Sequence, residues 1–182
     1  MMEKISLFST NVFMKHCNLD LKKLEQDCYN FSKQTKSEPR SGTGSQFRNF
    51  NCEDLFSEIQ ASIPQRQDYP LTNIKAAFWI NINKKDEFNN LHDHDPFLGN
   101  ALSGVFYVKT PEHCGNIRLY DPRFALTSAP DLKYYNSNNT YHFFKPEPNL
   151  LLIFPSWLQH LVEPNQSHED RVSISFNIQL DY

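Results

Sequence analysis

The sequence lacks an excess of positive charge. Its 18 Lys and Arg residues are outnumbered by 21 Asp and Glu residues, which gives a formal net charge of −3. Proteins that hold nucleic acid over a broad surface need a basic field to neutralise the phosphates. We therefore do not expect a nucleic-acid partner, although net charge says nothing against a small local groove.

The sequence also lacks a disulfide-type cysteine pattern and a membrane-spanning apolar run. Its four cysteines, Cys17, Cys28, Cys52 and Cys114, are widely spaced and form no CxxC pair, which argues for reduced thiols. No apolar run approaches the roughly 18 residues needed to cross a bilayer, and the chain does not open like a signal peptide. These absences predict a soluble, cytoplasmic protein with no membrane partner.

Aromatic residues are abundant, with 15 Phe and 8 Tyr, and this content favours packed β structure. The length of 182 residues suits one domain. Residues 1–68 read as an N-terminal helical extension packing on a barrel formed by residues 69–182. Apolar spacings near three and four over residues 19–31 predict one helix, capped by Asp20, and residues 52–63 predict a second.

After the extension the hydrophobic pattern changes to that of strands. The predicted strands are residues 76–83, 101–109, 115–120, 149–154 and 171–180, with a further short one at 160–164. No long helical pattern separates them, so an antiparallel barrel or sandwich is favoured. The polar segment 124–144 reads equally well as a binding loop or a tolerated insertion. Trp79 and Trp157 are expected in the core.

Three histidines form a candidate metal site. On extended backbone His92 and His94 would leave the same face, about 6 to 7 Å apart, although the surrounding sequence also suits an exposed polar loop. His160 follows a segment expected to be buried, where an imidazole needs a hydrogen-bond partner or a metal. Together in a β-barrel they would form an imidazole site with open positions suited to Fe(II).

Arg171 is a candidate anion-binding residue. It begins a strand in which apolar and polar residues alternate, and the polar face carries Arg171, Ser173, Ser175 and Asn177. On a half-exposed strand this face would only meet solvent. If it points into a barrel, the guanidinium fork needs an anion, and a dicarboxylate cosubstrate with a hydrogen bond from Ser173 fits that need.

Several motifs in combination resemble those of the 2-oxoglutarate- and Fe(II)-dependent oxygenases related to prolyl hydroxylases. The similarity runs from about residue 73 to 182. The motifs are Asn81, His92-x-His94, Leu102-Ser-Gly-Val-Phe-Tyr-Val108, Gly115-x-Ile-x-Leu-Tyr-Asp-Pro-Arg123, Phe154-Pro-Ser-Trp-Leu-x-His160-x-Val162-x-Pro164 and Arg171-x-Ser173-Ile-Ser-Phe-Asn177.

The resemblance implies a mainly β fold, a double-stranded β-helix or jelly roll with N-terminal helices. It also implies a dioxygenase that uses Fe(II), 2-oxoglutarate and dioxygen, hydroxylates its substrate and releases succinate and carbon dioxide. A prolyl or other peptidyl substrate is suggested by analogy alone, and small metabolites remain equally open.

The resemblance further assigns roles to residues by position. His92 matches the first metal ligand, His160 the distal histidine and Arg171 the residue that binds the C5 carboxylate of 2-oxoglutarate. Ser173 and Tyr107 match hydroxyl groups near that carboxylate. His94 stands where the superfamily has Asp or Glu, and we expect it to be the third ligand.

Some alternatives stay open at this point. Asp93 or Asp95 could replace His94 as the third ligand, or orient a ligand imidazole. Asn177 could contact the cosubstrate or only hydrogen-bond inside the sheet. The protein could instead be a cupin-like three-histidine dioxygenase or isomerase that does not use 2-oxoglutarate, or a noncatalytic jelly-roll binding module. Barrel edges or the N-terminal helix would allow two copies to form a homodimer.

Overall fold

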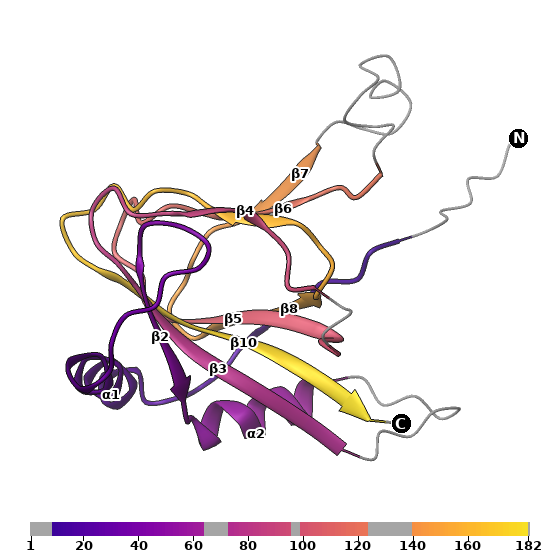
Figure 1. The fold of residues 1–182 in the computed structure, drawn as a ribbon, viewed down its shortest axis with the longest axis horizontal. Helices are drawn as coiled ribbons and strands as arrows, with labels where there is room; N and C mark the ends of the chain where they lie inside the picture. Colours follow the sequence, from indigo (N-terminus) through magenta and orange to yellow (C-terminus); the bar gives the residue numbers. More distant parts are fainter. Residues whose placement is uncertain (1–8, 64–72, 96–98, 124–139, 182) are drawn as a thin grey trace, which may run out of the picture.

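The computed structural model describes residues 9–63, 73–95, 99–123 and 140–181. Within these residues two antiparallel sheets face each other, and both helices lie on the far side of the larger sheet (Figure 1). The larger sheet has the order β1 (Phe13–His16), β8 (Leu150–Pro155), β5 (Leu102–Lys109), β10 (Arg171–Asp181), β3 (Asn73–Asn83) and β2 (Ser45–Phe50).

The smaller sheet has the order β4 (Asn89–His92), β9 (His160–Val162), β6 (Ile117–Tyr120) and β7 (Tyr141–Phe144). Every strand pairing in both sheets is antiparallel. This arrangement confirms the prediction of a mainly β, jelly-roll fold with N-terminal helices.

The two helices cover the outer face of the larger sheet. They are α1 (Leu21–Gln34) and α2 (Glu53–Ser62), close to the predicted ranges. The Asp20 carboxylate accepts hydrogen bonds from the first backbone N–H groups of α1, as expected of an N-cap. Leu24 of α1 and Ile59 of α2 are buried in one core with the outward side chains of β10.

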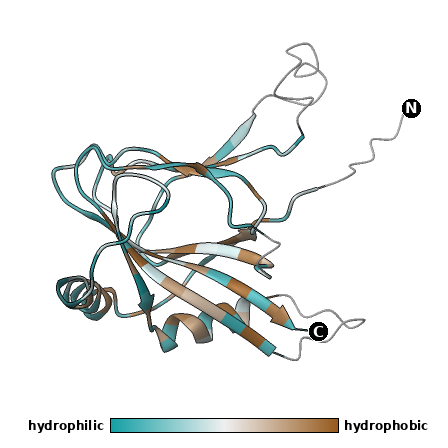
Figure 2. Cartoon of the chain, in the orientation of Figure 1, coloured by the Kyte–Doolittle hydropathy of each residue, from teal (hydrophilic) through white to brown (hydrophobic). Residues whose placement is uncertain are grey.

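Apolar and polar residues alternate along β10, so the two faces of the larger sheet carry different side chains. Val172, Ile174, Phe176 and Ile178 are fully buried in the core beneath the helices. Their polar neighbours therefore point between the two sheets, not to solvent, as one of the two sequence interpretations required. Figure 2 shows the hydrophobic residues mainly on strands and helices, whereas the connecting loops are mainly hydrophilic.

A smaller apolar core lies between the two sheets and closes one side of the barrel interior. Its members are Val105, Tyr107, Ile117, Leu119, Leu150, Leu152, Phe154 and Leu158. Because this core fills only part of the space between the sheets, the polar face of β10 adjoins a cleft in the remainder.

The structure adds four strands that the sequence analysis did not predict. The N-terminal segment supplies β1 and β2, the two edges of the larger sheet, so it is more than a helical extension. The other two are β4 and β7, and β7 occupies the end of the segment 124–144 expected to be a loop. The division proposed at residues 68–69, and the predicted loop over 124–139, lie outside the described residues.

All four cysteines are free thiols and buried. Trp79 is buried as expected, but Trp157 is 42% exposed and not part of the core, because it lies in the turn between β8 and β9. Among the described residues, no helix is long and apolar enough to cross a membrane.

Candidate active site

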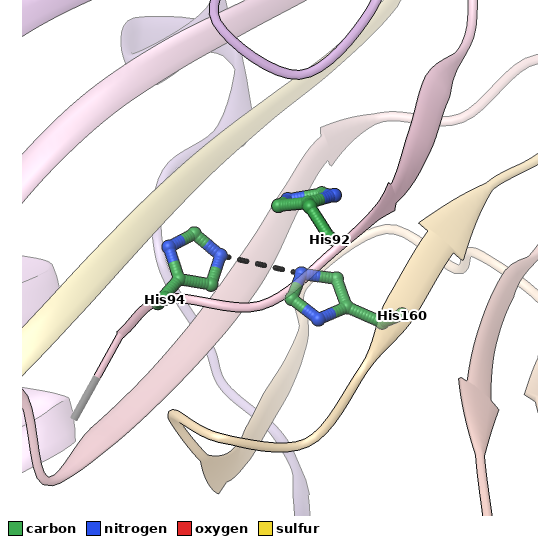
Figure 3. Close-up of side chains that lie close together, drawn as sticks. All are labelled: His92, His94 and His160. Carbon is green, nitrogen blue, oxygen red and sulfur yellow. Dashed lines mark hydrogen bonds between the residues drawn. The ribbon is translucent and has the colours of Figure 1, made fainter.

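The smaller sheet brings His92, His94 and His160 together. His92 ends β4 and is the register partner of His160 at the start of β9, while His94 follows two residues after β4. All three side chains converge (Figure 3), and each offers a ring nitrogen within 4.8 Å of the others. The ring centroids of His92 and His160 lie 4.3 Å apart.

Backbone carbonyls determine which nitrogens of two of these rings are available. Nδ1 of His92 lies 2.6 Å from the carbonyl oxygen of Asn90, and Nδ1 of His160 lies 2.9 Å from that of Leu158. A carbonyl only accepts, so each Nδ1 carries the proton and each Nε2 keeps a free lone pair. This tautomer leaves Nε2 of both rings available to bind a metal.

The spacing of the ring nitrogens also suits a single cation. Nε2 of His94 and Nε2 of His160 are 3.3 Å apart. Two nitrogens bound at about 2.1 Å and at right angles to one ion would be about 3.0 Å apart. Three neutral imidazole donors therefore fit one divalent transition metal, and the remaining coordination positions would be open to other ligands.

Burial keeps the three rings neutral. It lowers the pKa of His92 and of His160, and it lowers the pKa of His94 to about 4. Neighbouring histidines add to this effect for His94 and His160. A neutral imidazole is the form that binds metal, so near neutral pH the cluster has no proton to displace from its free nitrogens.

The neighbouring carboxylates do not join the cluster. Asp93 and Asp95 are exposed, and neither contributes an oxygen to the group of potential ligands. The Asp93 carboxylate instead accepts a long hydrogen bond from the backbone of Asp95. The geometry therefore favours His94 over either aspartate as the third ligand.

Arg171 lies at the start of β10 and is almost completely buried, with 1% of its surface exposed. Its Nη1 donates to the carbonyl oxygens of Cys114, Gly115 and Glu163. Its Nη2 is buried and has no acceptor among the described residues. Burial lowers the pKa of Arg171, but a guanidinium remains protonated in proteins. The site therefore presents a fixed cation with one unused donor.

Arg171 and the histidines line the same cleft. Tyr107 and Ser173, which are register partners across β5 and β10 of the larger sheet, line it as well. The lining comprises Ser41, Gln46, Trp79, Asn81, Asn83, Asn89, His92, His94, Gly104, Val105, Tyr107, Ile117, Phe154, His160, Val162, Arg171, Ser173 and Ser175. Burial raises the pKa of Tyr107, so its phenol stays protonated and can donate.

Asn177 is the one predicted site residue that the structure does not bring into the cleft. It continues the polar face of β10 beyond the lining residues, and its side-chain carbonyl accepts a hydrogen bond of 2.8 Å from the Ser103 hydroxyl. This contact agrees with the alternative role inside the sheet.

Asn83 and Gln46 also line the cleft, although neither was predicted to do so. The signal for Asn83 was available, because Asn81 and Asn83 alternate with apolar residues along β3 as the polar residues do along β10. Gln46 lies on β2, a strand that the sequence analysis did not predict, so its position could not be anticipated.

Comparison with known proteins agrees with this geometry. A family model described as "Putative 2OG-Fe(II) oxygenase" matches residues 77–177, a range that contains all the residues discussed for the cleft except Ser41 and Gln46. No curated protein sequence matches the chain significantly.

Solved structures share the fold at low sequence identity. A Pseudomonas putida prolyl-4-hydroxylase aligns with a TM-score of 0.68 and 13% identity over 96% of this chain and 95% of that one. A Trichoplax adhaerens prolyl hydroxylase in complex with a hypoxia inducible factor peptide aligns with a TM-score of 0.65, at 13% identity, over 94% and 84%.

HygX from Streptomyces hygroscopicus, with nickel and 2-oxoglutarate bound, aligns with a TM-score of 0.64 and 9% identity over 93% of this chain and 83% of that one. The family match covers more than half of the chain, and the fold and the three-histidine group agree with it. The chain therefore belongs to the 2OG-Fe(II) oxygenases, enzymes that use Fe(II) and 2-oxoglutarate.

Proposed function

We propose that His92, His94 and His160 hold Fe(II), that Arg171, Ser173 and Tyr107 hold the C5 carboxylate of 2-oxoglutarate, and that the enzyme hydroxylates a peptidyl substrate. The proposal rests on the side chains that meet in one cleft. Three neutral imidazoles with converging nitrogens lie in it together with a buried guanidinium that has an unused donor.

Bound Fe(II) supplies the redox chemistry by which dioxygen and 2-oxoglutarate yield succinate and carbon dioxide while a substrate carbon gains a hydroxyl group. The protein supplies the ligands and positions the ion and the cosubstrate. Three neutral ligands leave the full positive charge of the ion in place, and this favours an anionic cosubstrate more than a ligand set with a carboxylate would.

Arg171 gives the site its preference for a dicarboxylate. Its three carbonyl partners hold the guanidinium in place before any ligand arrives, so little side-chain entropy is lost on binding. A 2-oxo acid without the second carboxylate would leave the buried cation unpaired, which is unfavourable. Tyr107 and Ser173 add hydroxyl donors beside it.

A prolyl residue in a peptide is the substrate that we propose. The backbone N–H of His94 donates to the carbonyl of Ser156, so the turn that carries the exposed Trp157 is joined to the histidine cluster. The exposed indole on this turn offers an apolar face against which a proline ring can pack. The similarity to two prolyl hydroxylases, one of them in complex with a peptide, supports the same class.

The test is oxygen-dependent succinate formation from 2-oxoglutarate by protein loaded anaerobically with Fe(II). We expect slow turnover by the wild type, its loss in His160→Ala and Arg171→Ala, and no loss in His168→Ala, which removes an exposed histidine. Proline-containing peptides should accelerate turnover relative to matched peptides with alanine at that position.

Three outcomes would contradict all or part of the proposal. Failure to bind Fe(II) or Mn(II) would favour a noncatalytic binding module. A protein that binds the metal but neither binds nor consumes 2-oxoglutarate would favour a cupin-like enzyme. The same holds if Arg171→Ala leaves the activity unaffected. Turnover that no proline peptide accelerates would leave the cosubstrate assignment intact but reject the prolyl substrate.

A further inference from the structure

We propose that Asn83 is a second anchoring residue for the C5 carboxylate of 2-oxoglutarate, acting beside Arg171. The inference rests on the proposed role of Arg171 and extends it to a residue on the neighbouring strand. It would make the carboxylate site a pair of donors on two adjacent strands, β10 and β3.

The sheet register places the two residues together. Arg171 and Asn83 are direct partners in the antiparallel pairing of β10 and β3. The side chains of such partners leave the same face of a sheet, with Cβ atoms about 4.5 to 5.5 Å apart. Both residues line the cleft, and each has only 1% of its surface exposed.

Both residues also have a buried nitrogen without a hydrogen-bond acceptor. Among the described residues, three buried side-chain nitrogen atoms lack one, and they are Arg48 Nε, Asn83 Nδ2 and Arg171 Nη2. Arg48 stacks against the ring of Trp79, with its Cζ 5.2 Å from the ring centroid. The other two belong to one register pair in one cleft, so they lack acceptors at the same place.

Asn81 provides the contrast. It lies two residues earlier on the same face of β3, but its amide is satisfied within the protein: Gln46 Nε2 donates to its Oδ1, and its Nδ2 donates to the Ser175 hydroxyl. Unpaired buried donors are rare in folded proteins and call for a partner. The sheet pairs Asn81 internally and leaves Asn83 without a partner for its Nδ2.

The surroundings of Asn83 hold it in position. The Asn165 side chain donates to the main-chain carbonyl oxygen of Asn83 at 2.9 Å. On the other side, a Cβ atom at residue 44 would collide with the Asn83 amide nitrogen, so Gly44 leaves the room that this side chain occupies. The main chain of Asn83 is therefore fixed at the wall of the cleft, and its side-chain amide occupies the room that Gly44 leaves.

The chemistry of the missing partner follows from the two donors. A guanidinium and a carboxamide N–H₂ side by side need an acceptor with two oxygen atoms and a negative charge, which a carboxylate supplies. Of the two ends of 2-oxoglutarate, the C5 carboxylate is the one proposed to reach Arg171. Asn83 would then act on affinity for dicarboxylates and not on affinity for 2-oxo acids in general.

The experiment is calorimetric binding to Mn(II)-loaded protein without oxygen, so that no turnover is needed. The two ligands are 2-oxoglutarate and 2-oxovalerate, which keeps the five-carbon 2-oxo acid but has a methyl group in place of the C5 carboxylate. In Asn83→Ala we expect the affinity for 2-oxoglutarate to fall about tenfold or more, and the affinity for 2-oxovalerate to change less than about twofold.

Asn83→Asp should weaken 2-oxoglutarate binding further than alanine does, because its carboxylate faces the carboxylate of the ligand. Asn177→Ala, outside the cleft, is the matched control and should bind both ligands as the wild type does. Equal losses for both ligands in the Asn83 variants, or no loss for 2-oxoglutarate, would overturn the inference. Wild-type protein that binds Mn(II) but no 2-oxoglutarate would overturn the proposed function and this inference together.

Discussion

His92 and His160 are register partners across β4 and β9, and their ring centroids lie 4.3 Å apart. Residues far apart in the sequence are therefore held together by the hydrogen bonds of a sheet and not by a loop. With Nδ1 of each ring donating to a nearby carbonyl, the orientation of both side chains is fixed before any metal binds.

Removing His94 should therefore leave an incomplete metal site. We expect His94→Ala to weaken Mn(II) binding about 100-fold or more, because two of three ligands remain, whereas His94→Asp should restore much of the affinity by supplying a carboxylate. Isothermal titration calorimetry measures both. His142→Ala, at an exposed position, is the control. Unchanged Mn(II) affinity in His94→Ala would mean that another group is the third ligand.

Gly115 should be essential for the position of Arg171. Its φ is +81°, and an added Cβ atom would come within 2.6 Å of the carbonyl oxygens of Glu163 and Pro164. Since the carbonyls of Gly115 and Glu163 both accept from Arg171, Gly115→Ala should lower both the stability, by about 2 kcal/mol or more, and the affinity for 2-oxoglutarate.

The matched control is Gly99→Ala. Gly99 has the same φ of +81°, but the contacts of an added Cβ atom there would be 3.7 Å or longer. This variant should have the backbone strain without the displacement of Arg171. Thermal unfolding and 2-oxoglutarate binding distinguish the two variants, and equal affinity for 2-oxoglutarate in both would refute the role given to Gly115.

The metal-free protein should lose stability in mild acid. The folded-state pKa of His94 is about 4, below its ordinary value of about 6.5, so below about pH 6.5 the unfolded chain takes up a proton that the folded chain resists. Stability is then fully present above that pH and falls as the pH drops towards 4. From pH 7 to pH 5 this one residue contributes a loss of about 2 kcal/mol.

Urea unfolding of the metal-free protein at several pH values tests this expectation. His94→Gln removes the titrating group and should give a shallower decline over the same range. An equally steep decline in that variant would assign the acid sensitivity to other groups.

Ile174 should matter for stability more than for the site. It is fully buried on the helix-facing side of β10, opposite to the cleft. Ile174→Ala should cost about 2 to 5 kcal/mol through lost burial and a cavity, and Ile174→Val about 0.5 to 1.5 kcal/mol. Chemical denaturation gives these values. If Ile174→Val left stability unchanged but halved the 2-oxoglutarate affinity, the separation of the two faces would be wrong.

The strands that the sequence predicts well are those with several consecutive or alternating apolar residues, such as β8 and β10. The strands β1, β2, β4 and β7 have only four to six residues, too few for a clear alternation, and β4 (Asn89–His92) is mainly polar. Their extended state comes from pairing with neighbouring strands, and this contribution is not visible in a local pattern.

The candidate site likewise contains residues that the sequence predicts and others that only the fold selects. The three histidines and Arg171 could be chosen from residue type and spacing. The carbonyl groups that hold Arg171 could not, because every residue has a carbonyl and only the fold selects those of Cys114, Gly115 and Glu163. The importance of Asn83 likewise depends on its register with β10, which no spacing along the sequence reveals.

The place of β10 in the larger sheet has a consequence during biosynthesis. It is the last of the described strands in chain order, yet it lies between β5 and β3 in the middle of the sheet. A ribosome therefore releases β3 and β5 well before the strand that joins them, and until then each has an edge of unpaired backbone N–H and C=O groups. Such nascent chains are prone to associate with one another, and a chaperone that covers these edges until β10 emerges would raise the yield of folded protein.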